Sequence, residues 1–216
     1  MFVEKPLAAT TAECDEMIQA AEKAGVVFAV HQNRRPDVNF NELLDVLESG
    51  RLGDPQLIRI SLPHAGTARD WASHVVDQAL LLGRGNLVQV RGWTQYPERA
   101  SEEQGFGFME LEFEQRPLVI MEMIPGRNDS GTAFPLFYVA GDKDFYTTPC
   151  EHQWPNMHPI YDGLYRAIRE GAPTPVHPSI PRNVIYCFEL MEESSRQGRP
   201  LPADDWLPAG PFMRLR

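Results

Sequence analysis

Hydrophobic positions in the first fifty residues switch between strand and helix spacing. Residues 2–6 have the pattern of the end of a strand that runs directly into Pro6. A capping-box pattern that starts at Thr10, followed by apolar residues at helical spacing, predicts a helix over residues 10–25. The β-branched run 26–30 predicts a short buried strand, and a second amphipathic pattern predicts a helix over residues 40–50. The chain therefore opens with strand, helix, strand and helix.

The middle of the chain alternates with a period of two instead. In residues 106–114, Met109, Leu111 and Phe113 alternate with glutamates, which indicates a strand with one dry and one wet face. A helix over residues 70–82 interrupts this region. Similar patterns predict strands over 56–62, 86–96, 106–114, 118–124 and 134–139, closing helices over 160–171 and 184–198, and an extended tail over 200–211. We expect an α+β fold in which a mostly antiparallel open sheet has helices packed on one face.

Charge and cysteine content narrow the functional classes. The 216 residues carry a formal charge of −10, which argues against a nucleic-acid partner because phosphate binding needs a basic face. No stretch approaches the 18 consecutive apolar residues of a membrane span. The start of the chain lacks the pattern of a signal peptide, and three distant cysteines suit a reducing compartment. We expect a cytoplasmic protein.

The segment Glu4-Lys5-Pro6 is the first candidate for chemistry. A solvated ion pair at a strand end is one interpretation, since exposed charges are usually no more than that. In the other interpretation, Pro6 fixes the backbone and directs Lys5 at a ligand. A lysine there can donate a proton or hold a negatively charged oxygen.

The predicted helix over residues 70–82 carries the second candidate. At helical spacing, Asp70, His74 and Asp77 lie on one polar stripe. A histidine with a carboxylate four residues earlier can be oriented for acid–base work, whereas a helix-capping Asp70 and a surface His74 would have no such role. No second histidine lies nearby on this helix, so we expect no metal site.

The polar segment after the predicted buried strand is the third candidate. Gln32, Asn33, Arg34 and Arg35 follow the strand directly. They form either a solvated connection or a set of donors for phosphate, carboxylate or amide groups at the strand end.

Four motifs in sequence order resemble one family. They are Glu4-Lys5-Pro6-Leu7-Ala8, Gln32-Asn33-Arg34-Arg35, Ser49-Gly50-Arg51-Leu52-Gly53 and Asp70-x-x-x-His74-x-x-Asp77. Their order and spacing resemble the glucose–fructose oxidoreductase/inositol dehydrogenase/MocA (Gfo/Idh/MocA) family, and its inositol dehydrogenase-like members most. The likeness covers nearly the whole chain but is patchy over residues 126–157, which look shortened.

The resemblance implies a division of the chain and a role for each site residue. Residues 1–36 would be a strand-helix-strand remnant of a Rossmann nucleotide-binding domain, and residues 37–216 the substrate-binding and oligomerisation domain. Lys5, Asp70 and His74 would be catalytic and contact the substrate, with His74 as the acid–base residue. The cofactor would contact Lys5, Pro6, Gln32 and Arg34. The family often has glycine where this chain has Ala72.

The chain also departs from the family, because it contains no Gly-x-Gly-x-x-Gly fingerprint. NAD or NADP is the cofactor that the family implies, but we do not expect this chain alone to bind it. The leading hypothesis is the C-terminal catalytic portion of an NAD(P)-dependent oxidoreductase acting on a sugar, cyclitol or related polyol, cut inside its first domain and forming homo-oligomers through its open sheet. The alternatives are a non-catalytic assembly or binding module and, last, a hydrolase or lyase using Asp70 and His74.

Overall fold

The chain begins with a parallel strand-helix-strand unit. Strand β1 (Phe2–Glu4) pairs in parallel with β2 (Ala29–His31). Helix α1 (Thr11–Lys23) connects them, and its first turn has the predicted capping box, in which Thr10 and Glu13 satisfy each other's backbone N–H groups. β2 starts three residues later than the sequence pattern predicts.

The rest of the chain is organised around a seven-stranded sheet in the order β8-β7-β3-β6-β5-β4-β9. Only β3 and β6 pair in parallel, so the prediction of a mostly antiparallel open sheet is confirmed. The computed structural model describes residues 1–63, 68–95, 106–124, 135–148, 156–208 and 214–215. The strands are β3 (Pro55–Pro63), β4 (Arg84–Gln95), β5 (Phe106–Gln115), β6 (Leu118–Ile124), β7 (Leu136–Gly141), β8 (Phe145–Thr147) and β9 (Leu201–Pro202).

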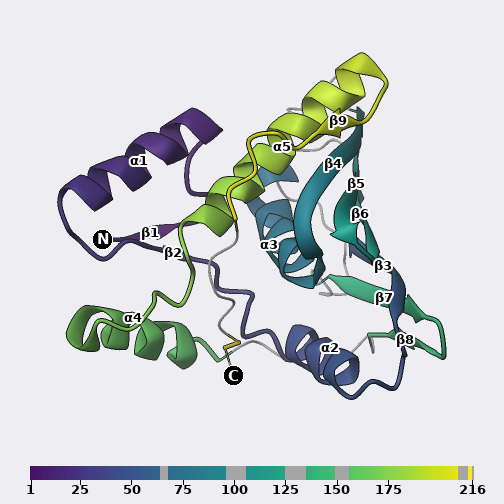
Figure 1. The fold of residues 1–216 in the computed structure, drawn as a ribbon, viewed down its shortest axis with the longest axis horizontal. Helices are drawn as coiled ribbons and strands as arrows, with labels where there is room; N and C mark the ends of the chain where they lie inside the picture. Colours follow the sequence, from purple (N-terminus) through teal and green to yellow (C-terminus); the bar gives the residue numbers. More distant parts are fainter. Residues whose placement is uncertain (64–67, 96–105, 125–134, 149–155, 209–213, 216) are drawn as a thin grey trace.

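Four more helices surround the two sheets. They are α2 (Val38–Glu48), α3 (Ala68–Leu82), α4 (His158–Glu170) and α5 (Ser179–Gln197). α3 and the long α5 cover one face of the large sheet, whereas α1 and α4 lie on opposite sides of the β1–β2 pair (Figure 1). Within the described ranges, no helix is long and apolar enough to cross a bilayer.

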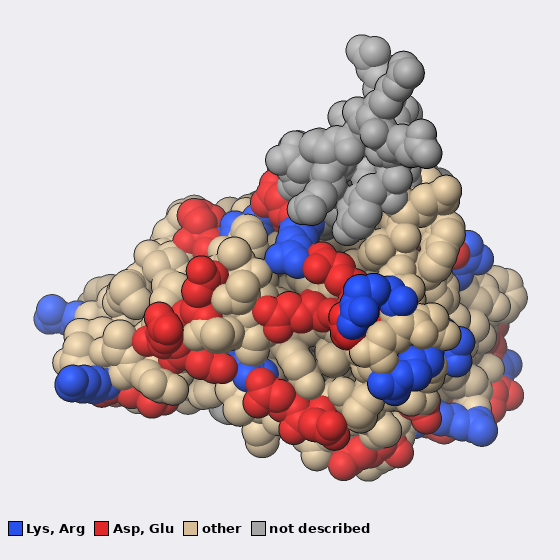
Figure 2. Space-filling model, turned by 90° about the horizontal axis from the view of Figure 1, so that it is seen from above, with Lys and Arg blue, Asp and Glu red and all other residues tan. Residues whose placement is uncertain are grey.

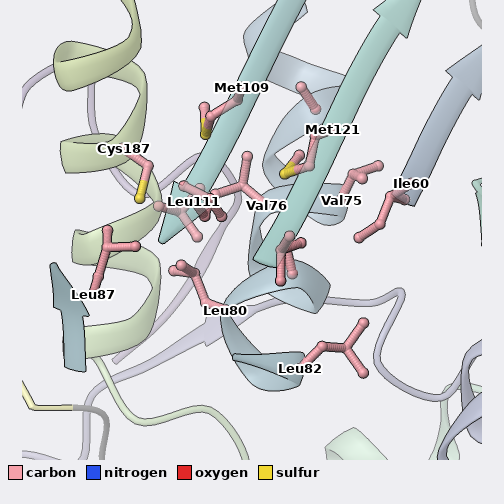
Figure 3. Packing of buried hydrophobic residues seen from close by; sticks show 14 of the residues in the cluster. Ile60, Val75, Val76, Leu80, Leu82, Leu87, Met109, Leu111, Met121 and Cys187 are labelled. Carbon is pink, nitrogen blue, oxygen red and sulfur yellow. The ribbon is translucent and has the colours of Figure 1, made fainter. Parts of the chain in front are cut away.

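The core lies between α3, α5 and the inner face of the large sheet (Figure 3). Met109 and Leu111 of β5 point toward the helices, as the alternation of that strand predicts, and meet Val76 and Leu80 of α3 and Cys187 of α5. Helix α3 is therefore held along its apolar side, which leaves its other side to face β1 and β2.

The opposite face of the large sheet carries large exposed side chains. Trp93 on β4 is 49% exposed, Tyr138 on β7 is 37% exposed and Phe145 on β8 is 60% exposed. The rings of Tyr138 and Phe145 stack with centroids 6.3 Å apart. Strands β3, β6 and β5 lie between this pair and Trp93, and the Arg59–Glu122 ion pair joins two of them on the same face.

Charge is mixed on the face seen in Figure 2. Aspartate and glutamate side chains lie between lysine and arginine side chains there, with no broad basic area. Both signs of charge therefore lie side by side on this face of a chain whose net charge is −10.

The last described residues return to α2. The Arg214 guanidinium donates to Asp45 Oδ1 at 2.7 Å, to Glu48 Oε2 at 2.8 Å and to the carbonyl oxygen of Asn41 at 2.6 Å. Asn41 Nδ2 in turn donates to the carbonyl oxygen of Leu215 at 3.0 Å. Helix α2 is thus tied to chain more than 160 residues away.

Candidate functional site

Lys5 lies at the carboxyl end of β1 and reaches helix α3. Its Nζ atom donates to the carbonyl oxygen of Asp70 at 2.9 Å and forms an ion pair with the Asp70 carboxylate. The Lys5 side chain is 12% exposed and that of Asp70 is 50% exposed. Pro6, which follows through a cis peptide bond, is exposed. The structure therefore brings Lys5 and Asp70 together, with the carboxylate open to solvent.

His74 lies one turn further along α3 and is 6% exposed. Its Nδ1 atom is fully buried and has no hydrogen-bond partner. Trp71 lies beside it, with ring centroids 6.1 Å apart. An unpaired polar atom in a buried position costs free energy, and such positions are usually satisfied by a ligand or by water.

The protonation state of His74 is set by its surroundings. Burial, and then the positive charges of Lys5, Arg34 and His31, hold the pKa of His74 well below its usual value of 6.5. Burial acts this way because it disfavours the charged imidazolium. The ring is therefore neutral at pH 7 and has a nitrogen available to accept a proton.

The residues after β2 face the same side of α3. Gln32 is 2% exposed, and its Oε1 atom is buried without a partner. The guanidinium of Arg34 lies over the Trp71 ring, 5.5 Å from its centroid, and contacts Asp37 at 3.5 Å. No local sequence pattern singles out Trp71, since only the fold brings it against Arg34.

Asp37 has an unusual titration for a carboxylic acid next to an arginine. Burial raises the pKa of Asp37 from 3.8 to about 7, and the nearby Arg34 only partly opposes this effect. Asp37 is 4% exposed and its pairing with Arg34 is long, so the carboxylate is poorly compensated.

Helical spacing predicts that Asp77 shares a polar stripe with Asp70 and His74. The structure contradicts this prediction. Asp77 is buried, with 1% of its surface exposed, and forms a bidentate ion pair with Arg35 at N···O distances of 2.8 and 2.7 Å. Surface exposure of His74 is likewise excluded. The sequence pattern missed the pairing because it joins residues 42 positions apart, and Arg35 reads as part of a polar connection.

The described residues contain no group of three histidine, cysteine, aspartate or glutamate side chains that could hold a metal ion. Two of the cysteines are buried free thiols. Burial raises the pKa of Cys14 to about 12 and raises that of Cys187 as well, so neither is an activated nucleophile.

The unpaired atoms on His74 and Gln32 fit a polar ligand such as the nicotinamide end of a dinucleotide or a hydroxylated substrate. Lys5 and Arg34, which follow the two parallel strands, lie close enough to His74 to lower its pKa, and Gln32 stands two residues before Arg34. The 216 residues contain no glycine fingerprint for a pyrophosphate, so the fit extends to one end of the dinucleotide only.

Known sequences are similar to parts of this chain. A sequence profile described as an oxidoreductase family with an NAD-binding Rossmann fold matches residues 1–32. The myo-inositol 2-dehydrogenase of Thermotoga maritima is 37% identical over 83 residues, which are 38% of this chain and 23% of that protein. The scyllo-inositol 2-dehydrogenase (NADP(+)) IolW of Bacillus subtilis is 23% identical over 231 residues, covering 94% of this chain and 64% of that protein. The chain thus spans less than two thirds of either relative.

Solved structures share the fold. The oxidoreductase yvaA from Bacillus subtilis superposes with a TM-score of 0.75 at 21% identity, covering 94% of this chain and 73% of that one. The WlbA dehydrogenase from Bordetella pertussis, solved with NADH and UDP-GlcNAcA, has a TM-score of 0.75 at 19% identity and covers 97% of this chain and 72% of that one. The profile match over residues 1–32 and the two relatives are both similar to this chain, and they agree with the resemblance of its four ordered motifs to the Gfo/Idh/MocA family of oxidoreductases.

Proposed function

We propose that this chain carries the substrate-side chemistry of an NAD(P)-dependent oxidoreductase that acts on a secondary alcohol of a sugar, cyclitol or related polyol. One observation carries the proposal: the Lys5–Asp70 ion pair lies beside a buried, neutral His74 whose Nδ1 atom has no partner. The names of the two inositol dehydrogenase relatives support the substrate class.

The roles of the three residues follow from their charges. Lys5 donates a hydrogen bond to the substrate oxygen and favours negative charge on it. His74 accepts the hydroxyl proton while the carbon loses its hydrogen as hydride, so that the secondary alcohol becomes a ketone with the loss of one proton and one hydride. Asp70 holds Lys5 in place and is open enough to contact a second substrate hydroxyl.

A nicotinamide bound here would accept the hydride. Lys5, Pro6, Gln32 and Arg34 are the residues we assign to its surroundings. The phosphates and the second ribose need elements that these 216 residues do not contain, so the chain alone lacks most of the binding energy for positioning the cofactor.

The test measures polyol-dependent reduction of NAD⁺ and NADP⁺, with inositols and sugars as substrates. The assay uses the chain itself and a fusion in which the nucleotide-binding half of the Bacillus subtilis relative precedes Met1. We expect turnover in the fusion, reduced by about 10²–10⁴-fold in His74→Gln and Lys5→Met. Lys23→Met is the matched control, because Lys23 is exposed at the end of α1. A fusion that binds NADPH and shows no polyol-dependent turnover would refute the proposal.

A second candidate is a non-catalytic assembly module in which two copies associate through the open face of the large sheet. The exposed rings of Trp93, Tyr138 and Phe145 favour it. A titration of NADH followed by tryptophan fluorescence separates the two, since Trp71 lies beside His74 and nicotinamide bound there would quench it. A module that only assembles would form dimers, would bind no nucleotide even as the fusion, and would lose nothing in His74→Gln.

A further inference from the structure

The Arg35–Asp77 ion pair is among the most deeply buried charged contacts in the described part of the chain. The two side chains are 1% and 2% exposed. Arg35 Nε and Nη2 donate to the two oxygens of Asp77 at 2.8 and 2.7 Å, and Arg35 Nη1 donates to the carbonyl oxygen of Pro175 at 3.4 Å. The contact therefore joins three separate segments: the chain after β2, helix α3 and the connection between α4 and α5.

A second buried link lies on the same two segments. Gln78 Nε2 donates to the carbonyl oxygen of Arg34 at 2.8 Å, and Gln78 is fully buried. Asp77 and Gln78 are thus bound to consecutive residues of the segment that follows β2. The Arg35–Asp77 ion pair and the hydrogen bond from Gln78 to Arg34 together fix the position of α3 along its axis and its rotation about that axis, relative to this segment.

The position of these links along α3 relates them to the site. Asp77 lies three residues and Gln78 four residues after His74, so both lie one turn from it on adjoining faces of the helix. A rotation of α3 that broke the links would turn His74 away from Lys5 and Arg34. Buried ion pairs contribute little net stability, because desolvation offsets their attraction, and they are better suited to selecting one arrangement.

We infer that Arg35, Asp77 and Gln78 are positioning residues that hold His74 of α3 in register with Lys5 and with the segment after β2. The inference rests on the proposed function only for its effect on catalysis, because the position of the His74 ring can be measured without turnover. Arg35 is needed as an arginine here, because a lysine in its place cannot make the paired contact with a carboxylate.

The experiment records the ring nitrogens of the histidines by ¹H–¹⁵N NMR in the full chain between pH 5 and 8, with the His74→Gln spectrum identifying the His74 signals. Arg35→Lys, Asp77→Asn and Gln78→Met are compared with wild type. We expect the His74 ring signals to shift in each variant and its titration to move upward toward the ordinary pH 6.5. Gln78→Met is the mildest of the three changes. If the ion-pair variants fail to fold, the His74 signals of Gln78→Met alone test the inference.

Arg182→Lys is the matched control. Arg182 is also buried, 2% exposed, and pairs with Asp15 and Asp205 away from the site. We expect this variant to lower the melting temperature and leave the His74 signals unchanged. The inference is overturned if Gln78→Met and Arg35→Lys lower the melting temperature with His74 signals as in wild type, or if Arg182→Lys moves them equally. Shifted signals in a protein without polyol turnover would count against the proposed function alone.

Discussion

The Nζ atom of Lys5 lies 2.9 Å from the backbone carbonyl oxygen of Asp70, a residue 65 positions further along the chain. The same ammonium group pairs with the Asp70 carboxylate. One lysine thus joins the end of β1 to the first turn of α3. Because the contact uses the backbone as well as the side chain, Lys5 keeps one partner even where the carboxylate turns to a ligand.

Replacing Asp70 with asparagine separates the contribution of the Lys5–Asp70 ion pair to stability from its contribution to turnover. The pair is half open to solvent, and exposed ion pairs contribute about 0–1 kcal/mol, so we expect the free energy of unfolding to change by less than that. Turnover of the fused enzyme should fall by at least 10-fold, since Lys5 loses its charged partner. Urea denaturation and initial rates measure the two effects. A loss of stability with unchanged kcat would assign the pair a structural role instead.

His74 makes stability depend on pH. Its pKa in the folded state lies well below 6.5, so the unfolded chain binds more protons as pH falls below 6.5. Stability due to this group is fully present above pH 6.5 and is lost as pH falls toward the folded pKa, by up to about 1.4 kcal/mol per pH unit. We expect the difference in unfolding free energy between wild type and His74→Gln to shrink or reverse between pH 7 and 5. A difference that is constant with pH would exclude a neutral buried His74.

Asp37 makes stability depend on pH in the opposite direction to His74. Its folded pKa of about 7 is above the value of 3.8 for a free carboxyl group, so the folded state holds the extra proton between these values. Wild type should therefore lose stability relative to Asp37→Asn as pH rises from about 4 to 7, by about 1.4 kcal/mol per pH unit at most. Guanidinium denaturation of both proteins at pH 4.5, 6 and 7.5 checks this. If the unfolding free energies of wild type and Asp37→Asn change with pH in parallel, Arg34 fully compensates the Asp37 charge.

Gly92 is required where β4 crosses under α5. A Cβ atom added there would lie 2.3 Å from the carbonyl oxygen of Met191, which belongs to the helix backbone and cannot move aside cheaply. We expect Gly92→Ala to lower the free energy of unfolding by about 1–3 kcal/mol. Gly107→Ala is the control, because its Cβ would meet the flexible end of Met123 at 2.5 Å and a rotation of that side chain relieves the clash. Equal losses in both variants would argue against close packing of α5 on β4.

The open face of the sheet should carry association between copies. The double variant Tyr138→Lys, Phe145→Glu places charge on two adjoining strands of that face, where both rings are exposed. We expect light scattering to report a dimer or larger species in wild type and a monomer in the variant, at unchanged melting temperature. Tyr165→Lys, 61% exposed on α4, is the control and should leave the mass unchanged. Dissociation by Tyr165→Lys alone would move the interface to α4.

Much of this fold could be predicted from the sequence because its signals are local. The capping box at Thr10 and the alternation of Met109 with glutamates each fix an element within a few residues. The pattern does not predict β8 and β9, which are three and two residues long and form only as edge pairings of strands distant in sequence.

The site was predictable in part for the same reason. Lys5 and His74 stand in short motifs that can be read directly. By contrast, the burial of Asp77 depends on Arg35 meeting it across 42 residues, and helical spacing alone places Asp77 with the exposed side chains. The low pKa of His74 likewise depends on charges from other elements, which no local pattern contains.

The contact between Arg214 and α2 has a consequence for synthesis on the ribosome. The guanidinium meets Asp45, Glu48 and the carbonyl oxygen of Asn41, so α2 gains these bonds only after Arg214 has left the exit tunnel. At typical elongation rates of about 5–20 residues per second, this delay is on the order of ten seconds or more after α2 emerges. During that time α2 lacks its bonds to Arg214, and a ribosome stalled before codon 214 would leave Asp45 and Glu48 without this partner.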